Sequence, residues 1–331
     1  MNPAKLVVIV NSFNRLNLLK QALASLILAL EKLPFASAIV VFEAGSTDGS
    51  IEWLGQFKDN LDKQGRPREI ISLELVIADR DNDTSFSAGV NKAVSRSCQI
   101  FPQFEYLLFY ETDNYLKSES PLLKAKELID SRKELAGCGF TVKKHDGTDA
   151  GAGCPFPSVG SFLIGPQLSL ILGVENSHEA LRDFADTKFM YSDVVFTSPL
   201  LLKREPFEQA KGFDAEVFPF SDCDVDFAYR LRKLGWRLAV LQSDEVIHDN
   251  QQELSGWSSK RAIHFHQARL KLLKRQLGPG VNLIKPLLLF RHFLEVCLLC
   301  LLVPFGANRK DQLQTRLSLL KTVMHNYSTP V

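Results

Sequence analysis

Two acidic residues, spaced two apart, follow an apolar run near the middle of the chain. The run Tyr106-Leu107-Leu108-Phe109 is typical of a buried strand, and Glu111 and Asp113 come directly after it. Two carboxylates about 4 Å apart repel by roughly 4 kcal/mol at an effective dielectric near 20, so a fold needs a reason to hold them together. A divalent cation is one reason. Solvation at an exposed loop is the other, and Asp113-Asn114, as ordinary turn chemistry, favours it when this stretch is taken alone.

A second acidic cluster, "SDCDVD" at 221–226, opens a helix predicted from about Asp222 to Gly235. Acids at a helix start suit its dipole, and Asp226 can pair with Arg230 one turn later. Capping therefore explains one or two of the three acids but not all of them. His248 follows the predicted strand "RLAVLQ", and because a lone histidine is usually a surface or core residue, its role depends on its neighbours.

The first hundred residues alternate between strand and helix patterns. This alternation predicts a parallel sheet with helices on both faces, in which ligands bind at the carboxyl ends of the strands. Four polar stretches fall at such ends, so we expect them to converge on one crevice. They are residues 11–14, 43–48, 81–85 and 111–114.

Composition indicates a globular protein of one large or two small domains, with 331 residues, 45% of them hydrophobic. The net charge of +1 gives no overall attraction to nucleic acid. Six cysteines without zinc-site spacing suit a reducing cytosol, and Cys297 and Cys300 are interpreted as packing residues among leucines.

The N-terminal apolar run is too short for a signal peptide, so we expect a cytoplasmic protein. The glycine- and proline-rich stretch 145–161 is either a substrate loop or a surface connection.

Six motifs in order resemble those of the family 2 glycosyltransferases with the GT-A fold, especially the rhamnosyltransferase-like branch. They are "VVIVNSFNR", "VVFEAGSTDGS", "DTSFSAGVNKA", "ETDN", "KGFDAEVFPFSDCDVDFAYRL" and "VIHD". The resemblance implies a Rossmann-like, mostly parallel sheet flanked by helices, with a helical C-terminal extension. It divides the chain into a nucleotide-sugar-binding half at 1–116, an acceptor-binding and catalytic half at 117–250, and a tail at 251–331.

The function implied by the resemblance is inverting, metal-dependent transfer of a sugar from a UDP-, dTDP- or GDP-sugar donor. The acceptor would be a hydroxyl of a glycan or lipid-linked molecule, as in cell-surface polysaccharide synthesis. A Mg²⁺ or Mn²⁺ ion would bridge the diphosphate and the carboxylates, which resolves their repulsion. On this reading Asp113 contacts the metal directly, Glu111 supports the ribose or the metal's water shell, and His248 completes the coordination.

The same resemblance assigns Asp224 as the base that removes the acceptor's proton, opposite the leaving group, which implies inversion. Glu43 stands where the family's aspartate contacts the pyrimidine, Ser12 and Phe13 stand at its T-Y, and Asp48 lies in the turn that shapes the pocket. The small residues at 87–89 let a helix approach either the nucleotide or the sheet closely. The metal and base positions match, so we expect an active enzyme.

Departures from the family pattern leave the nucleotide and the acceptor open. They are Asn11 for proline, Glu43 for aspartate, Ala44 for asparagine, Ser85 for glycine, Cys223 for glutamate, and "FTSPLL" for W-x-x-G-A. The last of these lies near the expected acceptor site.

The tail carries eight basic residues and no acid between Leu254 and Leu294, and these lead into the apolar stretch "PLLLFRHFLEVCLLCLLVPF". A spanning helix needs about 20 apolar residues, and Arg291 and Glu295 would each cost roughly 2.5 to 3.5 kcal/mol at its centre. Two interpretations stay open. The tail either lies on an anionic membrane surface, at the inner face of the plasma membrane, or packs as an ordinary helical cap.

Two other functions remain as alternatives. A sugar nucleotidyltransferase would be expected to carry a glycine-rich, basic phosphate loop after the first strand, and "VNSFNRLN" is not one. A non-catalytic nucleotide-sugar-binding subunit would show no turnover, whatever residue stands at position 224.

Overall fold

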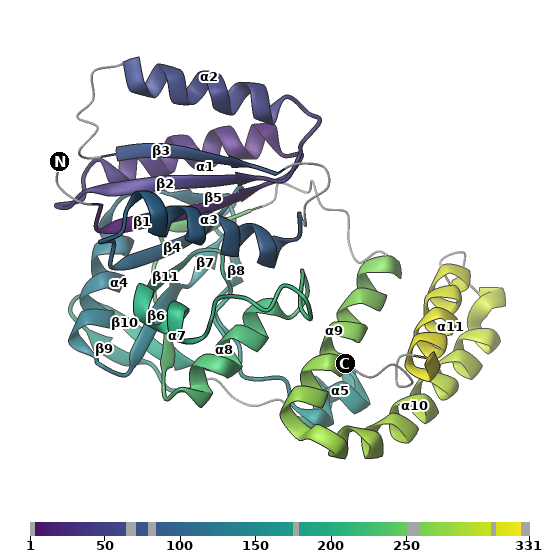
Figure 1. The fold of residues 1–331 in the computed structure, drawn as a ribbon. Coiled ribbons are helices and arrows are strands. Elements are labelled where there is room, and N and C mark those ends of the chain that lie inside the picture. The colour runs from purple at the N-terminus through teal and green to yellow at the C-terminus, as the bar shows by residue number, and fades with distance from the viewer. Residues whose placement is uncertain are drawn as a thin grey trace. The chain divides into compact units, whose positions relative to one another are not determined.

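The computed structural model describes residues 4–63, 71–78, 84–174, 179–249, 259–305 and 309–325. The chain forms two compact units (Figure 1). The first, here called the sheet unit, comprises Met1–Pro155 and His178–Leu254, and the second, the helical unit, comprises Phe156–Ser177 and Ser255–Val331. The glycine- and proline-rich stretch 145–161 contributes residues to both. The functional division at residue 116 stays a prediction.

The alternation of strand and helix predicted for the first hundred residues is confirmed. Strands β1 (Leu6–Ser12), β2 (Ser37–Glu43), β3 (Ile71–Ile77) and β4 (Tyr106–Glu111) alternate with helices α1 (Leu16–Leu30), α2 (Ser50–Lys63) and α3 (Phe86–Ile100). The strands pair in parallel in the order β3-β2-β1-β4. The order therefore reverses between β1 and β4, which is where open α/β sheets bind ligands.

The remaining strands extend this sheet and form a second, smaller one. The nine-stranded sheet runs β3-β2-β1-β4-β11-β6-β12-β10-β9, and among its described strands only β10 and β11 oppose the common direction. The four-stranded sheet runs β5-β13-β7-β8. The prediction of a mostly parallel sheet flanked by helices is thus confirmed. The further elements of the sheet unit are β5 (Asn114–Leu116), α4 (Ser120–Ser131), β6 (Leu135–Phe140), β7 (Val142–Lys143), β8 (Asp149–Gly151), β9 (Arg182–Phe184), β10 (Thr187–Ser192), β11 (Leu200–Lys203), α7 (Arg204–Gln209), α8 (Cys223–Lys233), β12 (Arg237–Leu241) and β13 (Val246–His248).

The two faces of the large sheet are covered by different kinds of side chain. Leucines of α1, α2 and α4 join the strands in one buried cluster. Phe109 of β4 packs against Phe207 and Phe213, and Phe213 lies 4.8 Å from Phe227 between ring centroids. Burying each such ring contributes about 1.5 to 3 kcal/mol, so this aromatic cluster fixes α7 and α8 on the sheet.

Gly89 explains the small residues at the start of α3. A Cβ atom at this position would lie 2.7 Å from Asn11 Oδ1 and would also meet the ring of Phe42. Only a glycine lets the helix lie this close to the ends of β1 and β2. The close approach is therefore one of helix to sheet.

Asp48 joins the first two strand–helix loops. Its Oδ1 accepts hydrogen bonds from the Ser50 N–H (3.1 Å) and hydroxyl (2.6 Å), and its Oδ2 accepts from the Leu16 N–H (2.8 Å). One carboxylate thus satisfies N-terminal N–H groups of both α1 and α2. Partial burial would raise the pKa of Asp48, but these hydrogen bonds outweigh it and hold that pKa below its ordinary value.

The helical unit consists of α5 (Val159–Ile164), α6 (Pro166–Leu172), α9 (Ser259–Leu277), α10 (Val281–Leu302) and α11 (Arg309–His325). Its core includes Phe162, Leu273 and Leu288. Arg291 donates to the Phe162 carbonyl (2.7 Å) and to Glu295 (3.1 Å), and Glu295 also pairs with Arg316 (3.1 Å).

The charges of the tail that argued against a span therefore tie α5, α10 and α11 together. Burial opposes ionisation of Glu295, but His292, Arg291 and Arg316 outweigh it and lower its pKa to about 2. Among the described helices, none combines enough length with enough apolar character to cross a bilayer.

Replacing Asp48, which caps both α1 and α2, should lower the stability of the fold. We expect Asp48→Ala to lower the free energy of unfolding by about 1 to 2 kcal/mol, because two helix N-termini lose their acceptor. Urea unfolding measures the effect. Asp59→Ala, at an exposed position within α2, should stay within about 0.5 kcal/mol of the parent. Equal stability of the two variants would contradict the capping role.

Candidate active site

The pairing of β5 with β13 brings His248 beside the acidic turn that follows β4. In this antiparallel pair His248 lies opposite Asn114, and the Asp249 N–H donates to the Asp113 carbonyl (2.9 Å). Residues more than a hundred positions apart therefore meet at the carboxyl end of β4. This is the edge where the strand order reverses.

Asp113 lies between two cationic or potentially cationic groups. Its Oδ2 is 3.2 Å from Arg15 Nη1, and its Oδ1 is 3.3 Å from His248 Nδ1. The side chain is only 5% exposed, and Oδ1 accepts no well-aligned hydrogen bond. Burial would raise the pKa of Asp113, but His248 and Arg15 outweigh it and lower that pKa. Conversely, burial would lower the pKa of His248, but Asp113 and Glu111 raise it above its ordinary value.

Two hydroxyl residues of the segment before β11 hold this group in place. Thr197 Oγ1 donates to Glu111 Oε1 (3.1 Å), and Ser198 Oγ lies 3.0 Å from His248 Nδ1. Ser198 also donates to Asn114 Oδ1 (3.1 Å). Partial burial and the charge of Asp113 raise the pKa of Glu111 to about 7. Glu111 therefore loses its proton at a higher pH than Asp113 does.

Asp113 and His248 fit a divalent cation. Asp113 Oδ1 and His248 Nδ1 lie 3.3 Å apart, and a carboxylate oxygen and an imidazole nitrogen are both groups that could hold such an ion. The unsatisfied Oδ1 is the atom such an ion would use. Over the described ranges no three acidic, histidine or cysteine side chains converge as a ready metal site, and the role of Glu111 stays a prediction. Mg²⁺ and related ions commonly bind through one or two protein groups plus substrate phosphates.

A cavity of about 510 Å³ opens beside this group, at the carboxyl ends of β1, β2 and β4. Its volume suits a small-molecule ligand. Phe13 and Phe220 are 56% and 64% exposed at its wall, so they offer aromatic faces on which a base can stack. The lining includes Asn11, Ser12, Phe13, Asn14, Arg15, Phe42, Ala44, Thr84, Phe86, Glu111, Thr112 and Phe220.

Two buried polar atoms at the ends of β1 and β2 have no protein partner; Ser12 lines the cavity, whereas Glu43 lies between Phe42 and Ala44, which line it, and is not itself part of the described lining. Glu43 is fully buried, and its Oε1 accepts from the Ser46 N–H (2.8 Å) while its Oε2 accepts nothing. The Ser12 hydroxyl is likewise buried and unpaired. Because leaving such groups unsatisfied costs about 1 to 3 kcal/mol each, they point to a ligand that supplies the missing hydrogen bonds.

Asp224 lies in the first turn of α8, where its Oδ1 accepts from the Val225 N–H (2.9 Å). Asp224 is not among the described residues that line the cavity. Burial raises the pKa of the neighbouring Cys223 thiol, and the charges of Asp224 and Glu111 raise it further. Ser87 of α3 donates to the Phe218 carbonyl (2.6 Å), which holds the preceding loop. The predicted pair of Asp226 and Arg230 is confirmed at 2.8 Å.

The described parts of the four predicted polar stretches do converge. Asn14 N–H donates to Ser46 Oγ (2.8 Å), and Asn11, Ala44, Thr84 and Glu111 line one cavity, whereas residues 81–83 lie outside the described residues. Asp48 does not line the cavity and acts through the loops it joins. The roles predicted for these side chains stay predictions.

Four residues at this site were not singled out from the sequence: Arg15, Thr197, Ser198 and Phe220. Arg15 and Phe220 stand inside the motifs that carried the resemblance, so their positions were available as a signal. Thr197 and Ser198 belong to the departing segment "FTSPLL", and no sequence pattern marks them.

Comparison with solved structures establishes the fold. The mannosyltransferase PcManGT of Pyrobaculum calidifontis, in complex with GDP-Man and Mn²⁺, matches with a TM-score of 0.56 at 14% identity, over 99% of this chain and 88% of that one. GalNAc-T7 with UDP, GalNAc and Mn²⁺ matches with a TM-score of 0.53 at 12% identity, over 98% of this chain and 57% of that one.

TarS of S. aureus matches with a TM-score of 0.50 at 16% identity, over 87% of this chain and 43% of that one. No family model and no curated protein matches the sequence. The chain is therefore similar in fold to GT-A glycosyltransferases, and at these identities the likeness extends to the fold alone.

The raised pKa of Glu111 predicts a stability that falls as pH rises. Because the folded protein holds this proton up to about pH 7, against an ordinary value of 4.5, stability decreases between those pH values. The raised pKa of His248 acts with the same sign, since its contribution is lost as pH rises through the folded value.

Thermal unfolding of Glu111→Gln without added divalent ions tests this. The variant should be more stable than the parent at pH 8, with the difference vanishing near pH 4.5. Glu127→Gln, an exposed change on α4, should follow the parent at both pH values. Identical pH dependence in Glu111→Gln and the parent would rule the interpretation out.

Proposed function

We propose that the chain is an inverting, metal-dependent glycosyltransferase of the family 2 type. It would move a sugar from a UDP-, dTDP- or GDP-sugar to a hydroxyl of a glycan or lipid-linked acceptor in surface polysaccharide synthesis. The observation that carries the proposal is the pair of Asp113, which is buried and has an unsatisfied carboxylate oxygen, and half-buried His248, beside a cavity that fits a small ligand. The GT-A fold supports the same conclusion.

Each part of the site has a task in this reaction. Asp113 and His248 would hold a Mn²⁺ or Mg²⁺ ion, which when bound neutralises charge on the diphosphate. Arg15 lines the cavity beside Asp113, so its guanidinium is placed to contact phosphate oxygens as well. Glu43 and Ser12 would supply hydrogen bonds to the nucleoside, and Phe13 an aromatic face.

Asp224 would act as the base. In this step its carboxylate takes the proton of the acceptor hydroxyl, whose oxygen forms a bond to the anomeric carbon. The bond from that carbon to the diphosphate breaks, and its electron pair leaves with the diphosphate. A single displacement of this kind inverts the anomeric centre.

Replacing the base should separate catalysis from binding. We expect Asp224→Asn to lower the turnover number by about 10²- to 10⁴-fold while leaving the affinity for UDP or GDP unchanged. The measurement is release of nucleoside diphosphate from a panel of UDP-, dTDP- and GDP-sugars with Mn²⁺, with a chelator arm that should abolish turnover. Glu216→Gln, an exposed change in the loop before α8, is the matched control.

Unchanged turnover in Asp224→Asn would show that the assigned base is wrong. If the parent binds nucleotides but turns over no donor, the chain is a binding subunit instead. Turnover that persists in chelator would exclude the metal.

We also propose that α10 docks on an anionic lipid surface, which would place the enzyme at the inner face of the plasma membrane. This helix buries Ile284, Leu288 and His292 in the helical unit, yet its opposite side is also apolar. The exposed side chains recur every three or four residues and are 50% to 78% exposed: Leu283, Leu287, Phe290, Leu294, Leu298 and Leu301. An apolar surface this extended, on the side of the helix that the unit does not bury, marks an interaction site.

The charge pattern favours lipid as that partner. Between Leu254 and Leu294 the chain carries eight basic residues and no acid. Of these, Arg291 is hydrogen-bonded to the Phe162 carbonyl within the helical unit, whereas the side chains of Lys271 and Lys274 are exposed on α9. Each basic residue near an anionic surface adds about 1 kcal/mol of attraction.

Acidic side chains within the exposed apolar stripe of α10, from Leu283 to Leu301, should abolish docking. We expect Leu287→Glu/Leu294→Glu to weaken co-sedimentation with vesicles of phosphatidylserine and phosphatidylcholine by about tenfold or more. Leu234→Glu, at a leucine that is 49% exposed in the sheet unit, should bind as the parent does. Absence of vesicle binding by the parent would contradict the proposal, and a dimer dissolved by the double variant would make the stripe a self-association face.

A further inference from the structure

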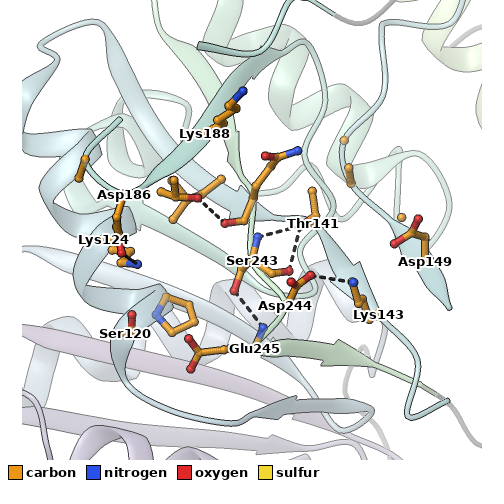
Figure 2. A pocket seen from close by; sticks show the side chains of 18 of the residues that line it. Ser120, Lys124, Thr141, Lys143, Asp149, Asp186, Lys188, Ser243, Asp244 and Glu245 are labelled. Carbon is orange, nitrogen blue, oxygen red and sulfur yellow. Dashed lines mark hydrogen bonds and ion pairs between the residues drawn. The ribbon is translucent and has the colours of Figure 1, made fainter. Parts of the chain in front are cut away.

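The sheet unit contains a second cavity, larger than the first and separate from it. Its volume is about 1270 Å³, and it shares no described lining residue with the cavity beside Asp113. It opens at the carboxyl ends of β6 and β12, between the start of α4, the turn joining β9 to β10, and strand β8 (Figure 2). None of the roles assigned above uses it.

The walls of this cavity are polar but not cationic. Each of its lysines is paired: Lys124 with Asp186 (2.8 Å), Lys143 with Asp244 (2.7 Å), and Lys188 with Asp183 (3.8 Å). Asp149 and Glu245 add two further carboxylates, so the described lining has three lysines against five acids. A polyanion such as a nucleotide or a phosphorylated glycan would meet a net negative charge here.

Neutral hydrogen-bonding groups complete the lining. Ser120, Thr187 and Gln242 contribute side chains, and the Ser243 N–H donates to Thr141 Oγ1 (2.9 Å), which in turn donates to the Ser243 carbonyl (3.0 Å). Figure 2 shows this pair in the middle of the wall, beside the ion pair of Lys143 and Asp244. Because these two residues use their donors on each other, they leave a ligand the remaining lone pairs of their oxygens. Together with the carboxylates of the lining, these acceptors match the hydroxyl donors of a sugar.

One aromatic residue faces this polar wall. Phe196 lines the cavity and is 44% exposed. Its segment is held by the reciprocal backbone hydrogen bonds of Cys154 and Val194, each 2.9 Å. The ring therefore offers an exposed apolar surface, which suits the C–H face of a sugar ring.

Two chain segments connect this cavity to the candidate metal site. Phe196 directly precedes Thr197 and Ser198, which contact Glu111 and His248. On the second segment, Glu245 lines the cavity three residues before His248, so their Cα atoms lie at most about 11 Å apart. A chain-like ligand in the cavity would thus lie next to the reacting centre.

From this placement we infer that the cavity binds an uncharged oligosaccharide, the part of the acceptor remote from its reacting hydroxyl. The inference rests on the proposed function. It adds the chemical class of the acceptor, a neutral glycan of several sugar units, and the residues that would hold it. It does not rely on Asp113, His248 or Asp224.

Binding by the full chain tests the inference, with titration calorimetry and saturation-transfer NMR as readouts. The probes are maltohexaose, cellohexaose and α1,6-mannohexaose, with an oligogalacturonate of equal length as the anionic comparison. UDP and GDP with Mn²⁺ are measured in parallel on the same samples. We expect at least one neutral hexasaccharide to bind, and the oligogalacturonate to bind at least tenfold more weakly.

Two variants locate the binding. Phe196→Ala should weaken the hexasaccharide by about five- to tenfold, and Ala152→Trp, which fills the cavity from its β8 side, should weaken it by about tenfold or more. Neither should change UDP or GDP binding. Phe220→Ala is the reciprocal control, because it should weaken the nucleotide and leave the hexasaccharide unchanged.

Failure of this inference is distinguishable from failure of the proposed function. If nucleotides bind but no neutral hexasaccharide does, or if both cavity variants bind it as the parent does, the inference is wrong and the transferase proposal stands. If a hexasaccharide binds through Phe196 but no nucleotide binds, the glycan site is real and the transferase proposal falls.

Discussion

The site depends on how the repulsion between the carboxylates of Glu111 and Asp113 is offset at the end of β4. Glu111 and Asp113 follow a strand whose side chains are almost wholly buried, so their repulsion is poorly screened there. Arg15 and His248 sit on either side of Asp113, and Glu111 keeps a proton to near neutral pH. The site is therefore balanced without a ligand, yet one buried oxygen of Asp113 accepts no well-aligned hydrogen bond. This unsatisfied carboxylate oxygen is the reason a divalent cation is chemically reasonable here.

Much of the surrounding architecture serves to hold this group. β13 brings His248 opposite Asn114, the segment before β11 contributes Thr197 and Ser198, and the Asp48 carboxylate locks the two loops that carry Arg15 and Ser46. Two of these segments also reach the larger cavity of the sheet unit, through Phe196 before β11 and Glu245 before β13. A donor site and a glycan site would thus be coupled through a few short stretches of backbone.

The fold could be predicted from the sequence wherever regular strands and helices determine it. The apolar runs ending at Ser12, Glu43 and Glu111 and the amphipathic helices between them dictate the parallel sheet, and the edge at which its polar ends meet follows from its topology. The sequence alone could not place Thr197 or Ser198, because their contacts arise from long-range packing of an irregular segment. It also could not show that Arg291 and Glu295, which argue against a membrane span, pair with each other within α10 and bind α5 and α11 through Phe162 and Arg316.

The central claim is that His248 and Asp113 bind one metal ion together with a nucleoside diphosphate. Electron spin-echo spectroscopy of Mn²⁺ bound with GDP or UDP reports directly on nitrogen atoms coordinated to the ion. The account predicts a modulation from one imidazole nitrogen that disappears in His248→Ala, and Mn²⁺ affinity that falls in Asp113→Asn. Tightly bound Mn²⁺ without any imidazole signal, or with a signal that survives His248→Ala, would contradict it.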